Sequence, residues 1–328
     1  MRIVVTGATG LLGNNIVRAA CQRGDEVIAL ARNASNSPSL HGLPVNSVNA
    51  DITDPQSLEF SIPRPVDAVV HAAAHIHLGW KGREESEKVN IAGTRNVLSL
   101  ASKLGARCIH VSTVNVLPVG QPDQVINEDS QGLPPIPCTY VQTKKGAEQE
   151  VRSAIDRGQD AVIVYPGFLL GPWDWKPSSA RMILDLRRGA PPLAPSGGCS
   201  ICDARDVARG VLEAAERAPR GGRFILAGEN WTYFELWTEI ASRLKRSKPW
   251  FAMRPPGRWL VGSVGDLLAK FSADEPVINS AALRMGAQYH WYSSQRAFDC
   301  FGYQSRPASE SLDDTIAWLR EHGKLDRS

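Results

Sequence analysis

Apolar positions near the N-terminus predict a strand, a helix and a second strand. Residues 2–5 form a short β-branched run, which is typical of a buried strand. Over residues 14–23 the apolar side chains recur with helical spacing, and residues 27–31 form a second buried run. The turn between the first strand and the helix carries glycines at every third position. This order of elements indicates the βαβ unit that binds a dinucleotide.

Each glycine of this turn has a physical reason. One allows a tight turn with an unusual backbone angle, one lets the backbone approach a pyrophosphate, and one lets helix and strand pack closely. The helix then offers free N–H groups and a positive dipole end to the phosphates. An ordinary strand-to-helix turn of another α/β protein is the alternative. The residues expected to contact the dinucleotide here are Gly7, Thr9, Gly10, Leu11, Leu12 and Gly13.

Strands and helices continue to alternate through the first half of the chain. Apolar runs predict further strands at residues 45–50, 66–74, 108–113 and 161–165. Helices are expected to begin at the Asp54-Pro55 pair, to cover residues 84–104, and to hold residues 140 and 144. This spacing predicts an α/β fold with a Rossmann-type, doubly wound parallel sheet and helices on both faces.

The pattern changes beyond Pro166. Amphipathic helices are predicted at residues 231–245 and 309–321, and residues 249–289 are mixed and mostly helical. We expect a Rossmann domain over residues 1–166, with returning segments near 202–227 and 290–302. A smaller α/β substrate-binding lobe is expected over residues 167–328. Residues 259–271 are apolar but too short to span a membrane, so we expect a helix packed over a pocket or a partner.

Composition narrows the classes of function. The 328 residues are 43% hydrophobic and 22% charged, which is typical of a globular protein with a large core. The net charge of +3 includes no basic run that would indicate nucleic acid or an anionic membrane, and we find no signal peptide or membrane span. Six cysteines indicate reduced thiols of a cytoplasmic protein. Cys199 and Cys202 form a CxxC without a second ligand pair, so no metal site is expected.

Tyr140 and Lys144 stand four residues apart, so they share one face of the predicted helix. A tyrosine with a pKa of about 10 is a poor acid or base at neutral pH. A lysine ammonium one turn away stabilises the phenolate and lowers that pKa. Ser112 and Thr113, at the end of the preceding strand, supply a hydroxyl that can bind the substrate oxygen. A solvated helix face is the alternative for this spacing taken alone.

Together these segments resemble an extended short-chain dehydrogenase/reductase. Within that superfamily the chain is most similar to the dihydroflavonol 4-reductase-like group and to hopanoid-associated sugar epimerases, the latter on residues 173–178. The resemblance covers nearly the whole chain. Its matching segments are residues 6–13, 51–52, 71–74, 89–97, 111–113, 140–144, 166–172 and 207–208, with a further match near 301–303.

The resemblance implies a role for each matching residue. Tyr140 would be the acid/base, Lys144 its activator and Thr113 the catalytic hydroxyl, with Ser112 as the second candidate. Asp51 and Ile52 would contact adenine, and Asn90 would support the site. Ala72 and Ala73 would line the cofactor channel, and Ala74 and Val111 are further candidates for cofactor contact. The segment of Tyr165, Pro166, Gly167 and Phe168 would pack near the nicotinamide, and the family often has Arg or Asn at the position of Tyr165.

The end of the second strand distinguishes the two nicotinamide cofactors. An acidic residue there would bind the ribose 2′-OH of NAD, whereas an arginine accommodates the 2′-phosphate of NADP. Arg32 and Asn33 follow the strand, and the nearest acids, Asp25 and Glu26, precede it. We therefore expect NADP. If Arg32 points only to solvent, NAD is accepted as well.

The expected reaction is reduction of a ketone or aldehyde in a small aromatic or apolar substrate. A dehydratase of this family would need an Asp-Glu pair where Val114 and Asn115 stand. An NAD-retaining nucleotide-sugar epimerase and a non-catalytic NADP-binding sensor are the alternatives. Family members often form homodimers, for which the helices around 84–104 and 140–155 are candidates. Candidate substrate residues are His75, His77, Trp173, Trp175, Lys176 and Arg181, although the aromatic ones suit the core of the lobe equally well.

Overall fold

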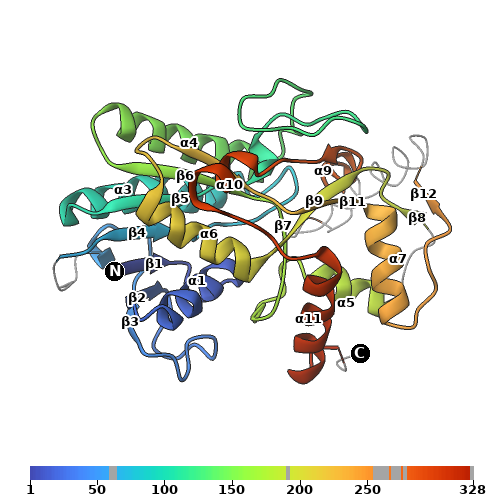
Figure 1. Cartoon of the computed structure of the whole chain (residues 1–328), viewed down its shortest axis with the longest axis horizontal. Coiled ribbons are helices and arrows are strands. Elements are labelled where there is room, and N and C mark those ends of the chain that lie inside the picture. Colours follow the sequence, from blue (N-terminus) through green and yellow to red (C-terminus); the bar gives the residue numbers. More distant parts are fainter. Residues whose placement is uncertain (59–64, 190–192, 254–265, 267–274, 276–278, 326–328) are drawn as a thin grey trace.

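A computed structural model describes residues 1–58, 65–189, 193–253, 266, 275 and 279–325 (Figure 1). Its centre is a seven-stranded sheet in the order β10-β6-β5-β4-β1-β2-β3, and every neighbouring pair is parallel. This confirms the predicted Rossmann-type sheet. The strands are β1 (Arg2–Thr6), β2 (Glu26–Ala31), β3 (Val45–Asn49), β4 (Ala68–His71), β5 (Arg107–Val111), β6 (Ala161–Pro166) and β10 (Arg223–Leu226).

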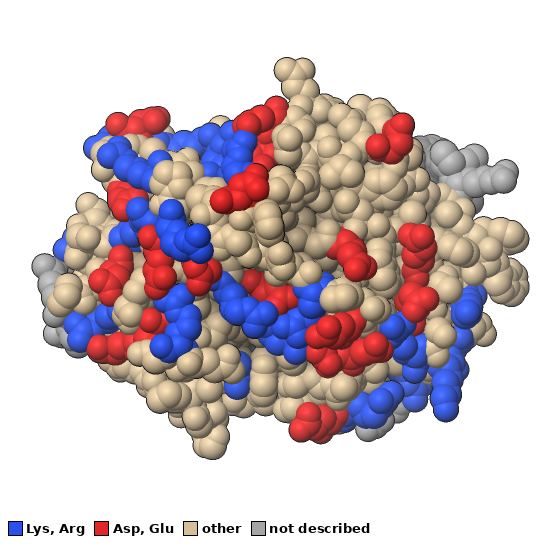
Figure 2. All heavy atoms as spheres, in the orientation of Figure 1, with Lys and Arg blue, Asp and Glu red and all other residues tan. Residues whose placement is uncertain are grey.

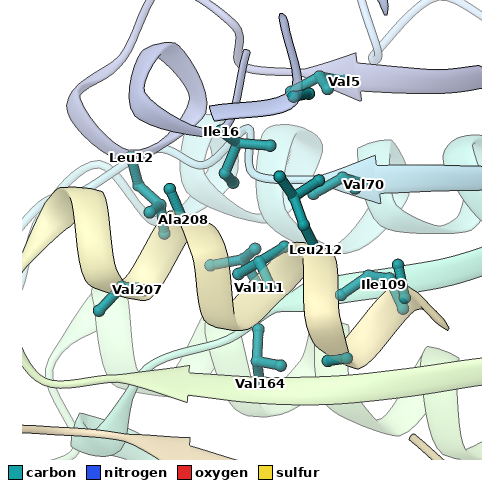
Figure 3. Close-up of a cluster of buried hydrophobic side chains, with 14 of the residues drawn as sticks. Val5, Leu12, Ile16, Val70, Ile109, Val111, Val164, Val207, Ala208 and Leu212 are labelled. Atoms are coloured by element: carbon teal, nitrogen blue, oxygen red, sulfur yellow. The ribbon is translucent and has the colours of Figure 1, made fainter. Parts of the chain in front are cut away.

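Helices cover both faces of this sheet because successive strand residues point to opposite sides. On one face, Val5 and Ile109 pack with Ile16 and Leu212 in a single buried cluster (Figure 3). On the other face, Val4 and its neighbours pack against two further helices. The first face is covered by α1 (Leu11–Gln22), α6 (Ala204–Arg217) and α10 (Gln295–Phe301), the second by α3 (Gly93–Leu104) and α4 (Thr139–Asp156).

The second half of the chain builds a smaller sheet with its own core. β9 (Gly198–Asp203) pairs with β7 (Phe168–Leu170), β11 (Glu229–Thr232) and β13 (Tyr289–His290). Three helices bury apolar side chains with it, α5 (Arg181–Arg188), α7 (Tyr233–Arg243) and α11 (Ala308–Glu321). Two short elements complete the lobe: β8 (Leu193–Ala194) pairs with β12 (Phe251–Ala252), and α9 (Ser280–Met285) precedes β13.

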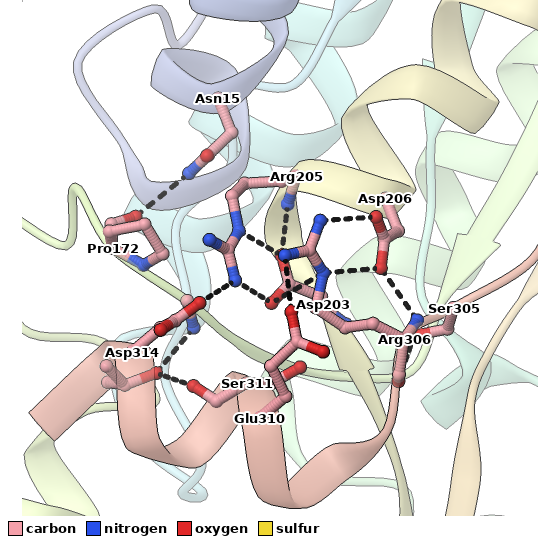
Figure 4. A network of polar contacts seen from close by, with 12 residues as sticks. Asn15, Pro172, Asp203, Arg205, Asp206, Ser305, Arg306, Glu310, Ser311 and Asp314 are labelled. Atoms are coloured by element: carbon pink, nitrogen blue, oxygen red, sulfur yellow. Dashed lines mark hydrogen bonds and ion pairs between the residues drawn. The ribbon is translucent and has the colours of Figure 1, made fainter.

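An ionic network joins the lobe to the part of the chain that forms the central sheet (Figure 4). Asp203 is fully buried at the start of α6 and accepts from the Arg205 backbone N–H at 2.8 Å and from its guanidinium at 2.7 Å. Arg205 also reaches Asp314 of α11 at 2.6 Å. Arg306 donates to buried Asp206 from its backbone N–H at 2.8 Å and from Nη2 at 3.0 Å. These contacts fix α11 against α6, which packs on the central sheet.

Several expected elements differ in extent. The helix expected over 84–104 is divided into α2 (Arg83–Glu87), a π-helical turn over Lys88–Ala92, and α3. The helix expected at residue 54 is a 3₁₀ turn, Gln56–Leu58, within the described residues. α7 begins at Tyr233 rather than at residue 231 because Thr232 and Glu235 form a capping box there. Residues 259–271 lie outside the described residues apart from Asp266.

The cysteines and the helices bear on two further expectations. All six cysteines are free, and burial raises the pKa of the Cys199 thiol to about 12. Cys199 and Cys202 of the CxxC pack in different hydrophobic clusters, which is the ordinary structural role expected for them. Of the helices that the structure describes, none is both long and apolar enough to cross a membrane.

Candidate active site

The glycine-rich turn after β1 has two glycines that the fold requires and one that it does not. Gly7 has φ of +69°, and a Cβ there would lie 2.6 Å from the Ala73 nitrogen. A Cβ on Gly13 would lie 2.1 Å from the Gly7 oxygen. Gly10 is exposed, and a Cβ there would meet only the Gly7 oxygen, at 3.4 Å. Packing therefore does not require a glycine at position 10. Because Gly10 has no side chain, its backbone is left open to a ligand.

This open surface adjoins the N-terminus of α1. The helix has neither a side-chain cap nor an acidic residue in its first turn. Its first N–H groups therefore have no partner within the helix and can bind an anion. Leu11 and Leu12 are buried and anchor the turn, while Thr9 is half-buried beside Gly10. The arrangement fits the pyrophosphate of a dinucleotide.

Arg32 and Asn33 lie exposed where β2 ends. In the part of the chain that the structure describes, no carboxylate lies within ion-pair distance of the Arg32 guanidinium. Its positive charge nevertheless acts on Asp51, whose Oδ1 accepts from the Thr53 N–H and hydroxyl at 2.9 Å each. Burial opposes ionisation of Asp51, but these hydrogen bonds and the charges of Arg32 and Lys88 lower its pKa overall. Arg32 is thus free to bind an anionic ligand beside Asp51 and the buried Ile52.

Thr113, Tyr140 and Lys144 meet at the carboxyl end of β5. Tyr140 and Lys144 share one face of α4, and the Tyr140 hydroxyl forms a hydrogen bond with the Thr113 side chain. The Lys144 Nζ donates to the Val111 carbonyl at 2.8 Å. The Ser112 hydroxyl is buried with no hydrogen-bond partner in the described structure. Of the two candidate hydroxyls, Thr113 is therefore the one that contacts Tyr140.

Burial sets the protonation of this pair. It raises the pKa of Tyr140 to about 12, although the hydrogen bond with Thr113 acts in the opposite direction. It also lowers the pKa of Lys144 to about 8, although the charge of Glu148 opposes this. At pH 7 the pair therefore consists of a neutral phenol and a cationic ammonium. The lower Tyr140 pKa expected from the neighbouring Lys144 is therefore not found here, because burial of the phenol acts more strongly.

A chain of buried hydrogen bonds connects α4 to the ends of β1 and β4. His71 Nδ1 lies 2.8 Å from the Thr6 hydroxyl, and its Nε2 lies 3.0 Å from the Thr94 hydroxyl. Thr94 donates to the Asn90 carbonyl at 2.6 Å, so it must accept from His71, whose proton is then on Nε2. Asn90 Nδ2 donates to the Thr143 hydroxyl at 2.9 Å. Asn90 thus connects the end of β1 to the turn of α4 that carries Tyr140.

His110, which the sequence did not single out, lies beside this chain. It pairs directly with His71 across β4 and β5, and the two ring centroids are 5.5 Å apart. Burial, together with the charge of Lys144, lowers the pKa of His71 to about 3 and that of His110 well below its usual value. Both rings therefore stay neutral, and Lys144 is not opposed by a second cation. In the sequence, the only sign of this buried pair of histidines is a histidine within an apolar strand.

The loop after β4 is fixed by both halves of the chain. Ala72 and Ala73 are half-buried and Ala74 is exposed at its start. The His75 N–H donates to Asn90 Oδ1 at 2.8 Å, and the His77 Nε2 lies 2.8 Å from a carboxylate oxygen of Glu275. Glu275 also accepts from the Trp80 and Lys81 backbone N–H groups. No local pattern in the sequence indicates this long-range contact.

The cofactor candidates at residues 165–168 lie in β6, in β7 and between them. The Tyr165 hydroxyl donates to Glu148 at 2.9 Å inside the core. Gly167 is required by packing, because a Cβ there would lie 2.5 Å from the Ser200 oxygen. Pro166 ends β6, and Phe168 begins β7 half-buried.

The aromatic candidates of the lobe belong to its core rather than to the site around Tyr140. The Arg18 guanidinium stacks 3.5 Å above the Trp173 ring, and the Trp173 and Trp318 centroids are 6.2 Å apart. Trp175 lies edge-on to Trp318 at 5.3 Å. Both tryptophans therefore pack in the core of the lobe, which was the alternative to binding substrate, because α11 covers them. Lys176 and Arg181 are exposed, and Arg181 lies 3.8 Å from Asp185.

Replacing Lys144 with Met is expected to stabilise the fold at pH 7. The unfolded lysine binds its proton more tightly, so burial of the cation costs about 3 kcal/mol below pH 8, and this cost decreases as pH rises toward 10.5. Loss of the hydrogen bond from Lys144 to the Val111 carbonyl should destabilise the variant by about 1 kcal/mol. Urea unfolding should give a gain of about 2 kcal/mol at pH 7 and almost none at pH 10. A gain that does not change with pH would contradict the assigned cause.

Comparison with known proteins agrees with this geometry. Residues 3–227 match the family described as NAD dependent epimerase/dehydratase. A protein of Synechocystis sp. named as a dihydroflavonol 4-reductase is 32% identical over 97% of this chain and 94% of its own length. Sterol demethylase protein B of Methylococcus capsulatus is 30% identical over 99% of this chain and 100% of its own length. The crystal structure of gox2253 superposes with a TM-score of 0.83 and 30% identity, covering 98% of this chain and 99% of the other.

Proposed function

The chain belongs to the NAD dependent epimerase/dehydratase family, whose members include the extended short-chain dehydrogenases/reductases, and on this premise we propose that it is an NADP(H)-dependent carbonyl reductase. Its proposed substrate is a ketone or aldehyde on an aromatic or apolar skeleton. The observation that carries the proposal is the buried neutral phenol of Tyr140, paired with Thr113 and backed by the Lys144 cation. The two relatives named for a dihydroflavonol and a sterol support an apolar substrate.

The residues that would hold the dinucleotide follow from the contacts described above. The open backbone at Gly10 and the first turn of α1 would bind the pyrophosphate, and Asp51 with Ile52 would lie against adenine. Ala72, Ala73, Ala74 and Val111 leave space along the carboxyl ends of β4 and β5. When bound, the dinucleotide supplies a hydride to the carbonyl carbon.

The protein's own part in the reaction is to bind and protonate the carbonyl oxygen. The Thr113 hydroxyl would bind this oxygen beside the Tyr140 hydroxyl. Tyr140 would give its proton to the oxygen as negative charge develops there, which a general acid does best from within hydrogen-bond distance. The Lys144 ammonium, one helical turn away, would then stabilise the phenolate. Asn90 and His71 would keep this turn of α4 in place through their hydrogen-bond chain.

Replacing Arg32 with Ala should change cofactor choice. The guanidinium has no carboxylate partner among the described residues, and a 2′-phosphate would form charge-assisted hydrogen bonds with it. Such bonds contribute about 1.5–3 kcal/mol, so kcat/KM for NADPH should fall by about 10- to 100-fold. The value for NADH, measured with the same variant and substrate, is the internal control and should change little. An equal fall with both cofactors would contradict the assignment of Arg32.

The competing function is an epimerase that retains NAD. Solved structures of nucleotide-sugar enzymes share the fold, at 23% identity and a TM-score of 0.79 for a nucleoside-diphosphate-sugar epimerase of Pseudomonas aeruginosa. Arg32 favours an exchanging NADP over a retained NAD. Dehydration is not proposed because Val114 and Asn115, next to Thr113, supply no carboxylic acid. A sensor without turnover would not need Tyr140 and Lys144 in contact with the site.

The proposal is tested by NADPH oxidation at 340 nm with a panel of aryl, steroidal and long-chain ketones and aldehydes. We expect turnover with apolar members of the panel and none with nucleotide sugars. Purified protein should release its nicotinamide cofactor on gel filtration. Tightly retained NAD, together with interconversion of sugar nucleotides and no net NADPH oxidation, would overturn the reductase proposal in favour of the epimerase.

A further inference from the structure

A basic cavity of about 460 Å³ lies where α5, α7 and α11 end. Arg187 comes from the last turn of α5 and Arg320 from the last turn of α11. Figure 2 shows Lys and Arg side chains gathered at the lower right of the molecule, in the region where α7 ends in Figure 1. The residues that line the cavity are five cations, Arg187, Arg243, Lys245, Arg246 and Arg320, and two leucines, Leu244 and Leu325.

Most of this positive charge is unpaired. Arg243 forms ion pairs with Glu239 and Asp313. Across the described ranges of the chain, no carboxylate lies within ion-pair distance of Arg187, Lys245, Arg246 or Arg320. A concentration of like charges is unfavourable for the isolated fold and attracts an anionic partner. The cations come from three separate segments, which is why no basic run in the sequence indicates them.

Two aromatic side chains follow directly along the chain. Trp250 is 71% exposed and Phe251 is 65% exposed, the highest values among the exposed large hydrophobic residues. Exposed Lys248 separates them from the cavity residues Lys245 and Arg246. Bulky aromatic side chains beside Lys and Arg are the combination that binds the interface of an anionic bilayer, with rings at the acyl boundary and cations at the headgroups.

Lys245 adopts a backbone conformation that normally favours glycine. Its φ is +54°, and the Arg246 N–H donates to the Ala241 carbonyl at 2.8 Å, which closes the C-terminus of α7. A glycine at this position would relieve the strain. The fold therefore holds a lysine where helix stability alone would favour another residue, and the lysine lies in the cavity.

We propose that this basic–aromatic surface, formed by Arg187, Lys245, Arg246, Lys248 and Arg320 with Trp250 and Phe251, docks the protein on a bilayer that contains anionic phospholipid. The cavity would bind one phosphate headgroup, and the two rings would enter the interface beside it. A nucleic acid fits less well, because its phosphates call for cations spread along a track and these cations surround one compact cavity.

The test is co-sedimentation of the full chain with phosphatidylcholine vesicles that contain or lack a quarter of phosphatidylglycerol. We expect binding only to the anionic vesicles at 100 mM NaCl, and its loss at 500 mM NaCl. Neutralising two cations in the Lys245→Gln/Arg246→Gln variant should weaken partitioning about 30-fold. The matched control Arg83→Gln/Arg220→Gln removes the same charge from other elements and should bind like the unchanged protein.

Two further variants separate docking from folding. Trp250→Ala/Phe251→Ala should weaken vesicle binding about 10-fold without loss of secondary structure. Lys245→Gly should raise the melting temperature and still weaken binding about 5-fold. Equal partitioning into neutral vesicles, no sedimentation with either composition, or tighter binding to a DNA duplex than to anionic vesicles would each overturn the proposal. Neither substrate nor cofactor is needed, so the outcome is independent of the proposed reaction.

Discussion

Replacing Tyr140 with Phe should lower kcat for carbonyl reduction by about 10³-fold. General acid catalysis contributes about 10²- to 10⁴-fold, and Tyr140, whose hydroxyl lies beside the Thr113 side chain, is the proposed proton donor to the carbonyl oxygen. Binding of NADPH should be retained, because the dinucleotide turn and Arg32 are untouched. Steady-state kinetics and a fluorescence titration with NADPH measure the two quantities separately.

Tyr165→Phe is the matched control. It removes the same hydroxyl from a second buried tyrosine, whose hydroxyl donates to Glu148. We expect the fold to lose about 1 kcal/mol and kcat to change by no more than a few-fold. Equal effects of the two substitutions on kcat would remove Tyr140 from the proposed role.

The second large effect is expected at the glycine-rich turn. Gly7→Ala places a methyl group 2.6 Å from the Ala73 nitrogen and forces a side chain into the left-handed region at φ +69°. The strain and the overpacking together should destabilise the fold by about 3 kcal/mol or more and abolish dinucleotide binding. Gly24→Ala has a similar φ of +79° with nothing within 4 Å, so it should cost only the conformational strain, about 1 kcal/mol.

Gly10→Ala separates cofactor binding from folding within the same turn. The added methyl group meets only the Gly7 oxygen at 3.4 Å, so the melting temperature should change little. The methyl group would, however, occupy the open backbone surface proposed for the pyrophosphate, and NADPH affinity should fall at least about 10-fold. Unchanged affinity in this variant would show that the dinucleotide lies elsewhere.

The buried parallel strands and both helical layers follow from local pattern, and the sequence was sufficient to predict them. Buried parallel strands are continuous apolar runs, and the glycine turn fixes where the first helix begins. The pairing of Tyr140 and Lys144 could also be predicted, because helical spacing alone places them on one face. The resemblance already favoured Thr113 over Ser112, but spacing alone could not, since the choice depends on which hydroxyl lies beside Tyr140 at the end of β5.

Other features depend on contacts between distant segments, and local pattern cannot predict them. Trp173 and Trp175 are aromatic in a lobe expected to bind substrate, but α11, more than a hundred residues later, covers them. Tyr165 begins the segment expected near the nicotinamide, and its side chain is directed toward Glu148 inside the core. The π-helical turn that positions Asn90 interrupts an otherwise regular helical pattern, and no proline or glycine lies within its five residues, Lys88–Ala92.

The most direct test of the reductase assignment is isotope transfer from NADPH that carries deuterium at both hydrogen positions of the nicotinamide C4. The protein would be incubated with this cofactor and an apolar ketone that it turns over, and the product alcohol analysed by mass spectrometry. The account predicts one deuterium on the former carbonyl carbon, with stoichiometric formation of NADP and loss of the transfer in Tyr140→Phe but not in Tyr165→Phe. Product that lacks deuterium, or NADPH that is not consumed while a substrate is interconverted, would contradict it.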